Sequence, residues 1–202
     1  KYHARMEAIG ALDEASAALG LARAQCTALQ TPPILLAAQR DLYKLMAEVA
    51  ATPENARRFH FIDESRVNWL EKQTDEISTM IEMPKEFILP GDTLGGAALS
   101  MARAIIRRAE RRVVSLFDED EVMNPDLQRY LNRLSSLCFV LELLENQNAG
   151  KKTSLAELAF SEYQKHSKFF ENDVYTMLDP RASLSRKRSA GSTSPKEVQK
   201  AI

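Results

Sequence analysis

Apolar residues recur every three or four positions along most of the chain, which is the spacing of amphipathic α-helices. The pattern predicts two long helices, residues 6–29 and 34–51, and the prolines that follow each of them set their ends. Asp63 is expected to cap a third helix, whose apolar stripe continues until Pro84. The first half of the chain is therefore predicted to be helical throughout.

Residues 91–116 predict a fourth helix with an unusual charge pattern. Its core, residues 101–114, carries five arginines and one glutamate. The arginines fall into two rows at helical spacing, and these rows are Arg103, Arg107, Arg111 and Arg108, Arg112. Because stacked like charges repel, such rows are tolerated best when carboxylates or a polyanion bind them. The pattern therefore predicts an acidic partner or an anionic ligand.

A fifth helix is predicted over residues 126–146, opened by Asn124 and Pro125. Its apolar seam consists of Leu127, Leu131, Leu134, Cys138 and Leu141. Five helices, short connections and no convincing strand pattern predict an all-α fold. We expect an antiparallel five-helix bundle with ferritin-like up-down packing and a C-terminal extension.

The domain organisation follows from a change of composition after Gly150. Residues 1–150 are expected to form the bundle, and residues 151–202 a C-terminal helix (155–170) followed by a polar, basic tail. Residues 179–195 are rich in Ser, Arg, Lys and Gly, so they gain order only by lying on the bundle, a neighbouring subunit or another partner.

Composition narrows the class of protein. The chain has 202 residues, a formal net charge of -1 and 45% hydrophobic residues, which suits one ordinary globular core. The near-zero charge argues against a nucleic-acid-binding protein, except through the basic tail. No apolar run approaches the roughly 20 residues that span a bilayer, so no membrane partner is expected. The chain begins at Lys1 without an initiator methionine, which leaves open whether another segment precedes it.

Cysteines and histidines add little chemistry. Cys26 and Cys138 lie among apolar residues, which predicts free thiols in a reducing compartment. The three histidines are dispersed without ligand spacing, so no metal site formed by the protein alone is expected. No Walker loop and no GxGxxG pattern is present.

Asp13 lies among small and apolar residues of the first helix, where we expect it to be partly buried and paired with a cation. Arg107 and Arg111 are the candidate partners. Two interpretations remain open. The pair could orient two helices within one chain, or it could cross a subunit boundary and shape a site for an anionic ligand.

Two further stretches could bind a ligand. Asn132, Ser136, Phe139 and Leu143 share one line of the fifth helix, which suits either a ligand pocket or a subunit contact. The loop with Phe87 leads into the glycine-rich start of the fourth helix, where backbone amides attract anions unless the Asp92 carboxylate caps them.

Residues 2–146 resemble the ATP:cob(I)alamin adenosyltransferases of the trimeric five-helix-bundle type. Three motifs in the family's order carry the resemblance, and these are GALDEASAALGLA, FILPGD followed by ARAIIRRAERRVV, and YLNRLSSLCFVL. The resemblance implies transfer of the 5'-deoxyadenosyl group of ATP to the cobalt of reduced cobalamin, with release of triphosphate. It also implies Mg2+ and an active site between adjacent subunits of a homotrimer.

The resemblance implies a role for each matching residue. Asp13 and Arg107 would form an intersubunit salt bridge, and ATP would be contacted by Arg107, Glu110, Arg111 and Asn132. Phe87 would lie beneath the corrin and displace its lower ligand. Ser136 and Phe139 would complete the cobalamin pocket. Phe87, Arg107 and Arg111 are accordingly the predicted catalytic residues.

The chain also departs from the family pattern. A Thr- and Gly-rich loop that wraps the triphosphate normally precedes the first helix, and here nothing like it stands before the predicted helix. Ser135 and Ser136 replace the Ser-Asp of the family's fifth helix. Two alternatives to an active enzyme follow, a structural subunit of a larger complex and a cobalamin carrier. For the enzyme, the expected site is the cytoplasm, or the mitochondrial matrix in a eukaryote, with a downstream cobalamin enzyme as a partner.

Overall fold

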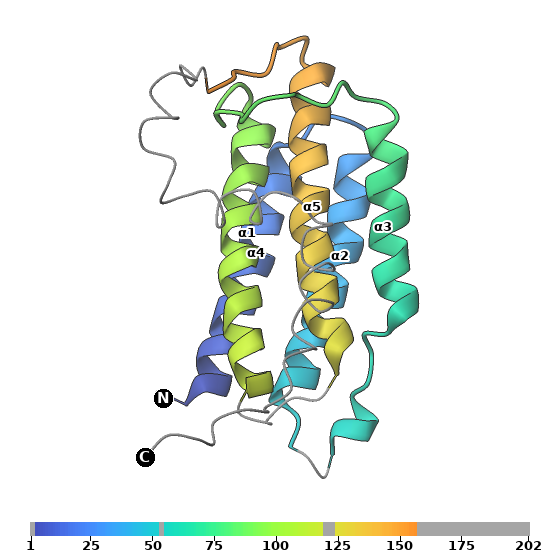
Figure 1. Ribbon diagram of the computed structural model, residues 1–202, viewed down its shortest axis with the longest axis vertical. Helices are drawn as coiled ribbons and strands as arrows, with labels where there is room; N and C mark the ends of the chain where they lie inside the picture. Colours follow the sequence, from blue (N-terminus) through green and yellow to red (C-terminus); the bar gives the residue numbers. More distant parts are fainter. Residues whose placement is uncertain (1–2, 53–54, 119–123, 157–202) are drawn as a thin grey trace, which may run out of the picture. The chain divides into compact units, whose positions relative to one another are not determined.

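The computed structural model describes residues 3–52, 55–118 and 124–156 of the chain. Within this part the chain forms five α-helices and one short 3-10 helix. Their bounds are α1 Ala4–Gln25, α2 Thr31–Ala50, η1 Ala56–Arg58, α3 Glu64–Ser78, α4 Leu94–Asp118 and α5 Pro125–Asn148. The all-α class and the helix number predicted for this region are confirmed (Figure 1).

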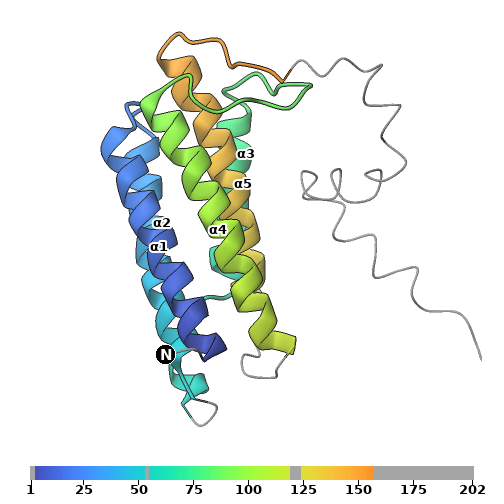
Figure 2. The ribbon, with the colours of Figure 1, turned by 90° about the vertical axis from the view of Figure 1, so that its left-hand side faces the viewer.

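Successive helices run in opposite directions along a common axis (Figure 1, Figure 2). Helix α4 packs against both α1 and α5, while α1 also contacts α2 and α3 also contacts α5. The predicted antiparallel bundle is therefore confirmed. Its arrangement places the arginine helix α4 in the middle of one side of the bundle, where it forms a seam with α5.

The core forms where the apolar stripes of the helices meet. All five residues of the predicted α5 seam are completely buried. Of the α2 residues that helical spacing turns inward, Leu35, Leu42, Leu45 and Val49 are completely buried and Met46 is half-buried. Cys138 lies in this core as a free thiol, and burial raises its pKa to about 12. None of the described helices combines the length and the apolar character needed to cross a membrane.

Helix α1 ends at Gln25, four residues earlier than predicted, because a distant side chain turns the chain there. The Glu145 carboxylate of α5 accepts hydrogen bonds from the Thr27 and Ala28 backbone N–H groups at 2.8 and 3.1 Å. Leu29, the last residue of the predicted helix, is consequently 90% exposed. A tertiary contact here overrides the local helical pattern.

The connection between α3 and α4 is long, which differs from the short connections that were predicted. Helix α3 ends at Ser78, so residues 79–93 cross the end of the bundle without forming a helix. Ile88 in this connection forms an isolated antiparallel bridge with Leu155. The helix predicted from residue 155 is therefore wrong at its start, and its remainder, like the tail 179–195, lies outside the described residues.

One buried polar cluster joins α2, α3 and α5, and we call Asp41, Arg66 and Tyr130 the Asp41 cluster. The Asp41 carboxylate is 2% exposed and accepts hydrogen bonds from Arg66 Nε and Nη2 at 2.9 and 2.5 Å. The Tyr130 hydroxyl donates to the same carboxylate at 3.0 Å. Burial raises the pKa of Tyr130 well above its usual value, so the hydroxyl remains a donor. Every polar group of this cluster has a partner inside the chain.

Candidate functional site

The seam between α4 and α5 carries a half-buried polar pair. The Asn132 side-chain amide on α5 donates a hydrogen bond to Glu110 Oε1 on α4 at 3.1 Å. Burial raises the pKa of Glu110, whereas the Asn132 hydrogen bond and the nearby Arg107 and Arg111 guanidinium groups lower it. The four residues predicted to contact ATP thus gather in one region of the seam.

Arg107 and Arg111 form no direct ion pair within the described part of the chain, although both lie near the Glu110 carboxylate. Arg107 is half-buried and Arg111 is exposed, and neither forms a hydrogen bond or an ion pair within the described residues. Guanidinium groups in this state are suited to binding carboxylates or phosphates from outside the chain. The seam is therefore chemically prepared for an anion.

Arg103, one turn before Arg107, belongs to the same seam. Its guanidinium carbon lies 5.7 Å from the centre of the Phe139 ring, within the range of a cation–π contact. Burial and the neighbouring Arg107 lower the pKa of Arg103, while the Glu142 carboxylate on α5 raises it. Phe139 thus lies in the seam beside a cation, and its predicted place in the cobalamin pocket stays a prediction.

Glu142 is the most unusual group of the seam. It is 1% exposed, and its Oε1 has no hydrogen-bond partner within the described residues. Burial raises its pKa from 4.5 to about 7, whereas a hydrogen bond with Ser100 and the charge of Arg103 lower it. A buried carboxylate with an open acceptor is costly unless a donor or a proton satisfies it.

Asp13 is exposed, which corrects the expectation of partial burial. No ion pair joins it to Arg107 or Arg111 within the described part of the chain. The ion pair between α1 and α4 is formed instead by the next residue, Glu14, with Arg108. An exposed position costs a carboxylate little, so burial does not force Asp13 to pair within its own chain.

The other predicted α5 positions divide between surface and core. Ser136 is half-buried and its hydroxyl donates to the Asn132 carbonyl oxygen at 3.4 Å, whereas Leu143 is 4% exposed and belongs to the core. The line of four residues is therefore not one continuous surface. Asn132, Ser136 and Phe139 remain available at the seam, and Leu143 does not.

Phe87 lies in the connection between α3 and α4, at one end of the bundle, and is 38% exposed. Arg107 follows the first residue of α4 by a length of helix of about 20 Å, so one chain holds the two residues apart. The alternative in which Asp92 caps α4 is wrong. Thr93 Oγ1 accepts the Gly96 N–H at 2.9 Å instead, and Asp92 accepts hydrogen bonds from Ser154.

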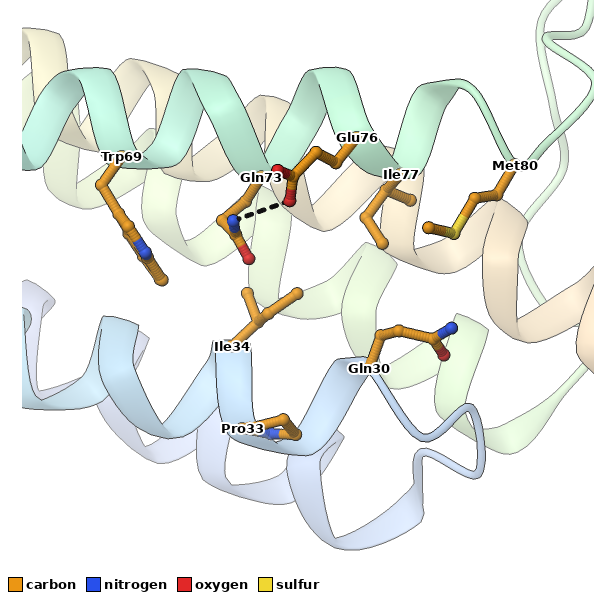
Figure 3. A pocket seen from close by; sticks show the side chains of 8 residues that line it. All are labelled: Gln30, Pro33, Ile34, Trp69, Gln73, Glu76, Ile77 and Met80. Atoms are coloured by element: carbon orange, nitrogen blue, oxygen red, sulfur yellow. Dashed lines mark hydrogen bonds between the residues drawn. The ribbon is translucent and has the colours of Figure 1, made fainter.

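A groove on another side of the bundle lies apart from these residues. It has a volume of about 340 Å³ and is lined by the start of α2 and by α3, through Gln30, Pro33, Ile34, Trp69, Gln73, Glu76, Ile77 and Met80 (Figure 3). Gln73 Nε2 donates to Glu76 Oε2 at 3.1 Å, so these polar groups satisfy one another. No cation among the described residues lines this groove, in contrast to the arginines of the seam between α4 and α5.

The sequence model of the family described as cobalamin adenosyltransferase matches residues 1–145. The chain belongs to this family. The match covers all five helices almost to the end of α5, and so it includes the whole seam of the adenosyltransferase fold.

Curated adenosyltransferases from several organisms match the same region. The corrinoid adenosyltransferase PduO of Salmonella typhimurium is 34% identical over 160 residues, which are 79% of this chain and 47% of that protein. The corrinoid adenosyltransferase of Bacillus subtilis is 35% identical over 150 residues, which are 72% of this chain and 76% of that protein. The chain thus spans about half the length of the PduO proteins it matches.

Solved adenosyltransferase structures share the fold. An arginine-to-lysine variant of the PduO-type enzyme of Lactobacillus reuteri, complexed with ATP, superimposes with a TM-score of 0.72 and 30% identity, covering 78% of this chain and 89% of that chain. A phenylalanine-to-alanine variant of the same protein, complexed with cobalamin and ATP, gives 0.73 and 30% identity, covering 78% and 88%.

Two seam residues of this adenosyltransferase family member were missed from the sequence. Arg103 was noted without a partner, and Glu142 was not noted at all. A signal for Glu142 exists, since it and Glu145 are the two acids in an otherwise apolar stretch near the end of α5. The contact of Arg103 with Phe139 depends on the register between α4 and α5, which no local pattern encodes.

Proposed function

We propose that this protein transfers the 5'-deoxyadenosyl group of ATP to the cobalt of reduced cobalamin and releases triphosphate. The observation that carries the proposal is the seam, where half-buried Glu110 bonded to Asn132 lies beside Arg107 and Arg111, two arginines that form no ion pair within the described residues. Family membership and the ATP and cobalamin complexes of the Lactobacillus reuteri protein support the same assignment.

In the proposed reaction the electron pair of Co(I) forms the bond to C5' of ATP, while the C5'–oxygen bond breaks and triphosphate leaves with the electron pair of the broken bond. Cobalt supplies the nucleophile, so the protein needs no general base. Arg107 and Arg111 would neutralise the leaving triphosphate, and Glu110 with Asn132 would orient the nucleotide. Mg2+ bound to ATP needs only one or two carboxylates, and Glu110 is our candidate.

We assign Phe87 to the lower face of the corrin, with Ser136 and Phe139 in the cobalamin pocket. The phenylalanine and the arginine that were substituted in the Lactobacillus reuteri structures lie twenty positions apart in that protein. Phe87 and Arg107 have the same separation here. This spacing supports Phe87 for the cobalamin side and Arg107 for the ATP side of one site.

The decisive assay measures the formation of adenosylcobalamin from ATP and chemically reduced cobalamin. The absorbance change of the corrinoid reports the reaction. We expect turnover that is lost in Arg107→Ala. Phe87→Ala should lower turnover while the ATP dissociation constant stays within about twofold, because the ring acts on cobalt and not on phosphate. Binding of both ligands without product would instead identify a carrier, and binding of neither would point to a structural subunit.

We further propose a homotrimer in which Asp13 pairs with Arg107 of a neighbouring subunit. The exposed face of α1 supports an interface, since it combines Asp13 with Gly10, Ala17 and the exposed apolar Leu21. Because each arginine row lies on α4, the ATP site would then be completed across the boundary. A reducing compartment, the cytoplasm or the mitochondrial matrix, suits both Co(I) and the free thiols.

A charge reversal tests the pairing. Asp13→Arg should dissociate the trimer and weaken ATP binding by about tenfold or more, and Arg107→Asp in the same chain should restore the trimer in part but not ATP binding, because Arg107 also faces the triphosphate. Asp75→Arg, the same change at an exposed position of α3, is the control and should alter neither. Restoration by Arg103→Asp instead of Arg107→Asp would contradict the assignment of Arg107.

A further inference from the structure

The backbone around Phe87 is held by a segment from the far end of the described chain. Leu89 N–H donates to the Ser154 carbonyl oxygen at 2.8 Å, and Ala156 N–H donates to the Phe87 carbonyl oxygen at 2.7 Å. Between these two bonds, Ile88 and Leu155 form the antiparallel bridge. Figure 1 and Figure 2 both show residues after α5 running beside the connection that precedes α4.

We call residues 151–156 the strap, and its path is set by the end of α5. Gly150 has a φ of 65°, a left-handed conformation that glycine adopts without strain. The Lys151 N–H then donates to the Asn146 carbonyl oxygen at 2.9 Å, which reverses the chain over the last turn of the helix. The strap therefore leaves α5 in a fixed direction, toward the Phe87 connection.

Two side chains fasten the strap to the start of α4. The Asp92 carboxylate accepts hydrogen bonds from the Ser154 backbone N–H at 2.9 Å and from its hydroxyl at 2.7 Å. These bonds lower the pKa of Asp92, so the carboxylate stays ionised. Asn146, which is 2% exposed, accepts from Thr93 Oγ1 at 2.9 Å and donates to Thr153 Oγ1 at 3.3 Å.

Phe87 itself has little other support. Its side chain is partly exposed, and it lies in a connection without helical hydrogen bonds. A ring that presses on a ligand needs a backbone that does not yield, because a small displacement removes the contact. In the described chain, the two neighbouring backbone groups that fix this position are paired with the strap.

We infer that the strap is a positioning element for Phe87, and that Ser154, Asp92 and Asn146 act on the cobalt side of the site through that ring. This inference rests on the proposed function, because it assigns Phe87 to the corrin. The strap touches none of the four ATP-side residues through a hydrogen bond within the described chain. Its loss should therefore affect cobalt coordination and leave nucleotide binding intact.

The test uses the whole chain with Ala156→Pro, which removes the N–H that binds the Phe87 carbonyl and suits the extended backbone there. Lys152→Pro is the matched control, since Lys152 is exposed and its N–H makes no hydrogen bond within the described residues. Electron paramagnetic resonance of bound cob(II)alamin with ATP measures the four-coordinate fraction, and calorimetry measures ATP affinity.

We expect Ala156→Pro to lower the four-coordinate fraction by about fivefold or more while the ATP dissociation constant changes by less than about twofold. Ser154→Ala should give a smaller loss, and Ser154→Thr, which keeps the hydroxyl, should restore the wild-type spectrum. A wild-type spectrum in Ala156→Pro overturns the inference, as does an equal loss of ATP affinity.

Failure of the proposed function gives a different result. If the unmodified protein forms no adenosylcobalamin from cob(I)alamin, that function is wrong whatever the variants show. The strap is then still measured by hydrogen exchange. The Leu89 and Ala156 amides should be protected in the unmodified protein and in Lys152→Pro, and the Leu89 amide should lose its protection in Ala156→Pro. Unprotected amides in the unmodified protein would overturn the strap itself.

Discussion

Helix α5 has one side on which buried charges are satisfied and another on which they are not. Toward α2 and α3, the Asp41 cluster pairs its carboxylate with a guanidinium and a phenol at 2.5–3.0 Å. Toward α4, Glu142 is equally buried but has an oxygen without a partner, and Arg107 forms no ion pair within the described chain. Helix α5 therefore borders one polar cluster in which the charges are paired and another in which some are not paired within the described chain.

The difference separates structural from functional electrostatics. Burying a charge costs several kcal/mol unless a partner is in place, so a seam with open acceptors and unpaired cations lowers the stability of the lone chain. Binding or assembly regains that free energy when a ligand or a second subunit supplies the partners. Substitutions on the α3 side should accordingly affect folding, and substitutions on the α4 side should affect binding.

The largest effect is expected at Asp41. Asp41→Asn removes the charge that pairs with Arg66 and leaves the guanidinium without its partner, which should lower the free energy of unfolding by about 3 kcal/mol in urea titrations. Asp75→Asn makes the same change at an exposed position of α3 and should have almost no effect. Adenosyl transfer per folded molecule should be unchanged, and a selective loss of transfer would contradict the division between the two sides.

Glu142→Gln should have the next largest effect, and in the opposite direction. The folded protein holds the pKa of Glu142 near 7, above its usual 4.5, so the folded state keeps a proton that the unfolded state releases. Stability from this group is therefore present at about pH 4.5 and is lost as the pH rises through 7.

The glutamine variant cannot titrate and should be more stable than the parent by about 2 kcal/mol at about pH 8 but not at about pH 5. Thermal unfolding at both pH values measures this. Arg103 and Asp92, the charged groups recorded around Glu142, remain in place and act in opposite directions on its pKa. The same gain at both pH values would show that packing rather than ionisation causes it.

Glu110→Gln should weaken ATP binding and raise the stability of the fold slightly. The glutamine oxygen can still accept the Asn132 hydrogen bond, and removal of the half-buried charge should stabilise the chain by about 1 kcal/mol or less. ATP affinity measured by calorimetry should nevertheless fall by about tenfold, because the carboxylate is lost from the nucleotide side. Unchanged ATP affinity would place Glu110 outside the site.

The smallest effect is expected for the exposed ion pair between Glu14 and Arg108. Glu14→Gln should change the free energy of unfolding by less than about 0.5 kcal/mol, since water screens both groups. Added salt should remove even this difference. A larger effect would mean that this surface is covered in the assembled protein.

The side of α5 that faces α2 and α3 was easier to predict from the sequence than the side that faces α4. The α5 seam and the α2 stripe follow from apolar spacing alone, because burial of those residues drives the packing of the helices. Gathering of Glu110 and Asn132 followed from the family motifs. The exposure of Asp13 could not be predicted from its apolar neighbours, since those neighbours line an open face of α1.

Local sequence patterns do not predict the strap and the end of α1, for a different reason. Ile88 and Leu155 are far apart in sequence, and a single bridge leaves no alternation that would predict a strand. Helix α1 ends where the Glu145 carboxylate meets the Thr27 and Ala28 amides. Such contacts depend on where α5 ends in space, which is known only once the bundle is assembled.

Glu145 and Asn146 also affect the order in which parts of the chain can fold during synthesis. These adjacent residues hold the turn after α1 and the strap near Phe87, so the last turn of α5 fastens two segments that lie far apart in the sequence. A nascent chain that ends at Val140 can form its first helices on the ribosome but cannot complete this end of the molecule. The end of the bundle that holds Phe87 should therefore be the last part of the described chain to fold.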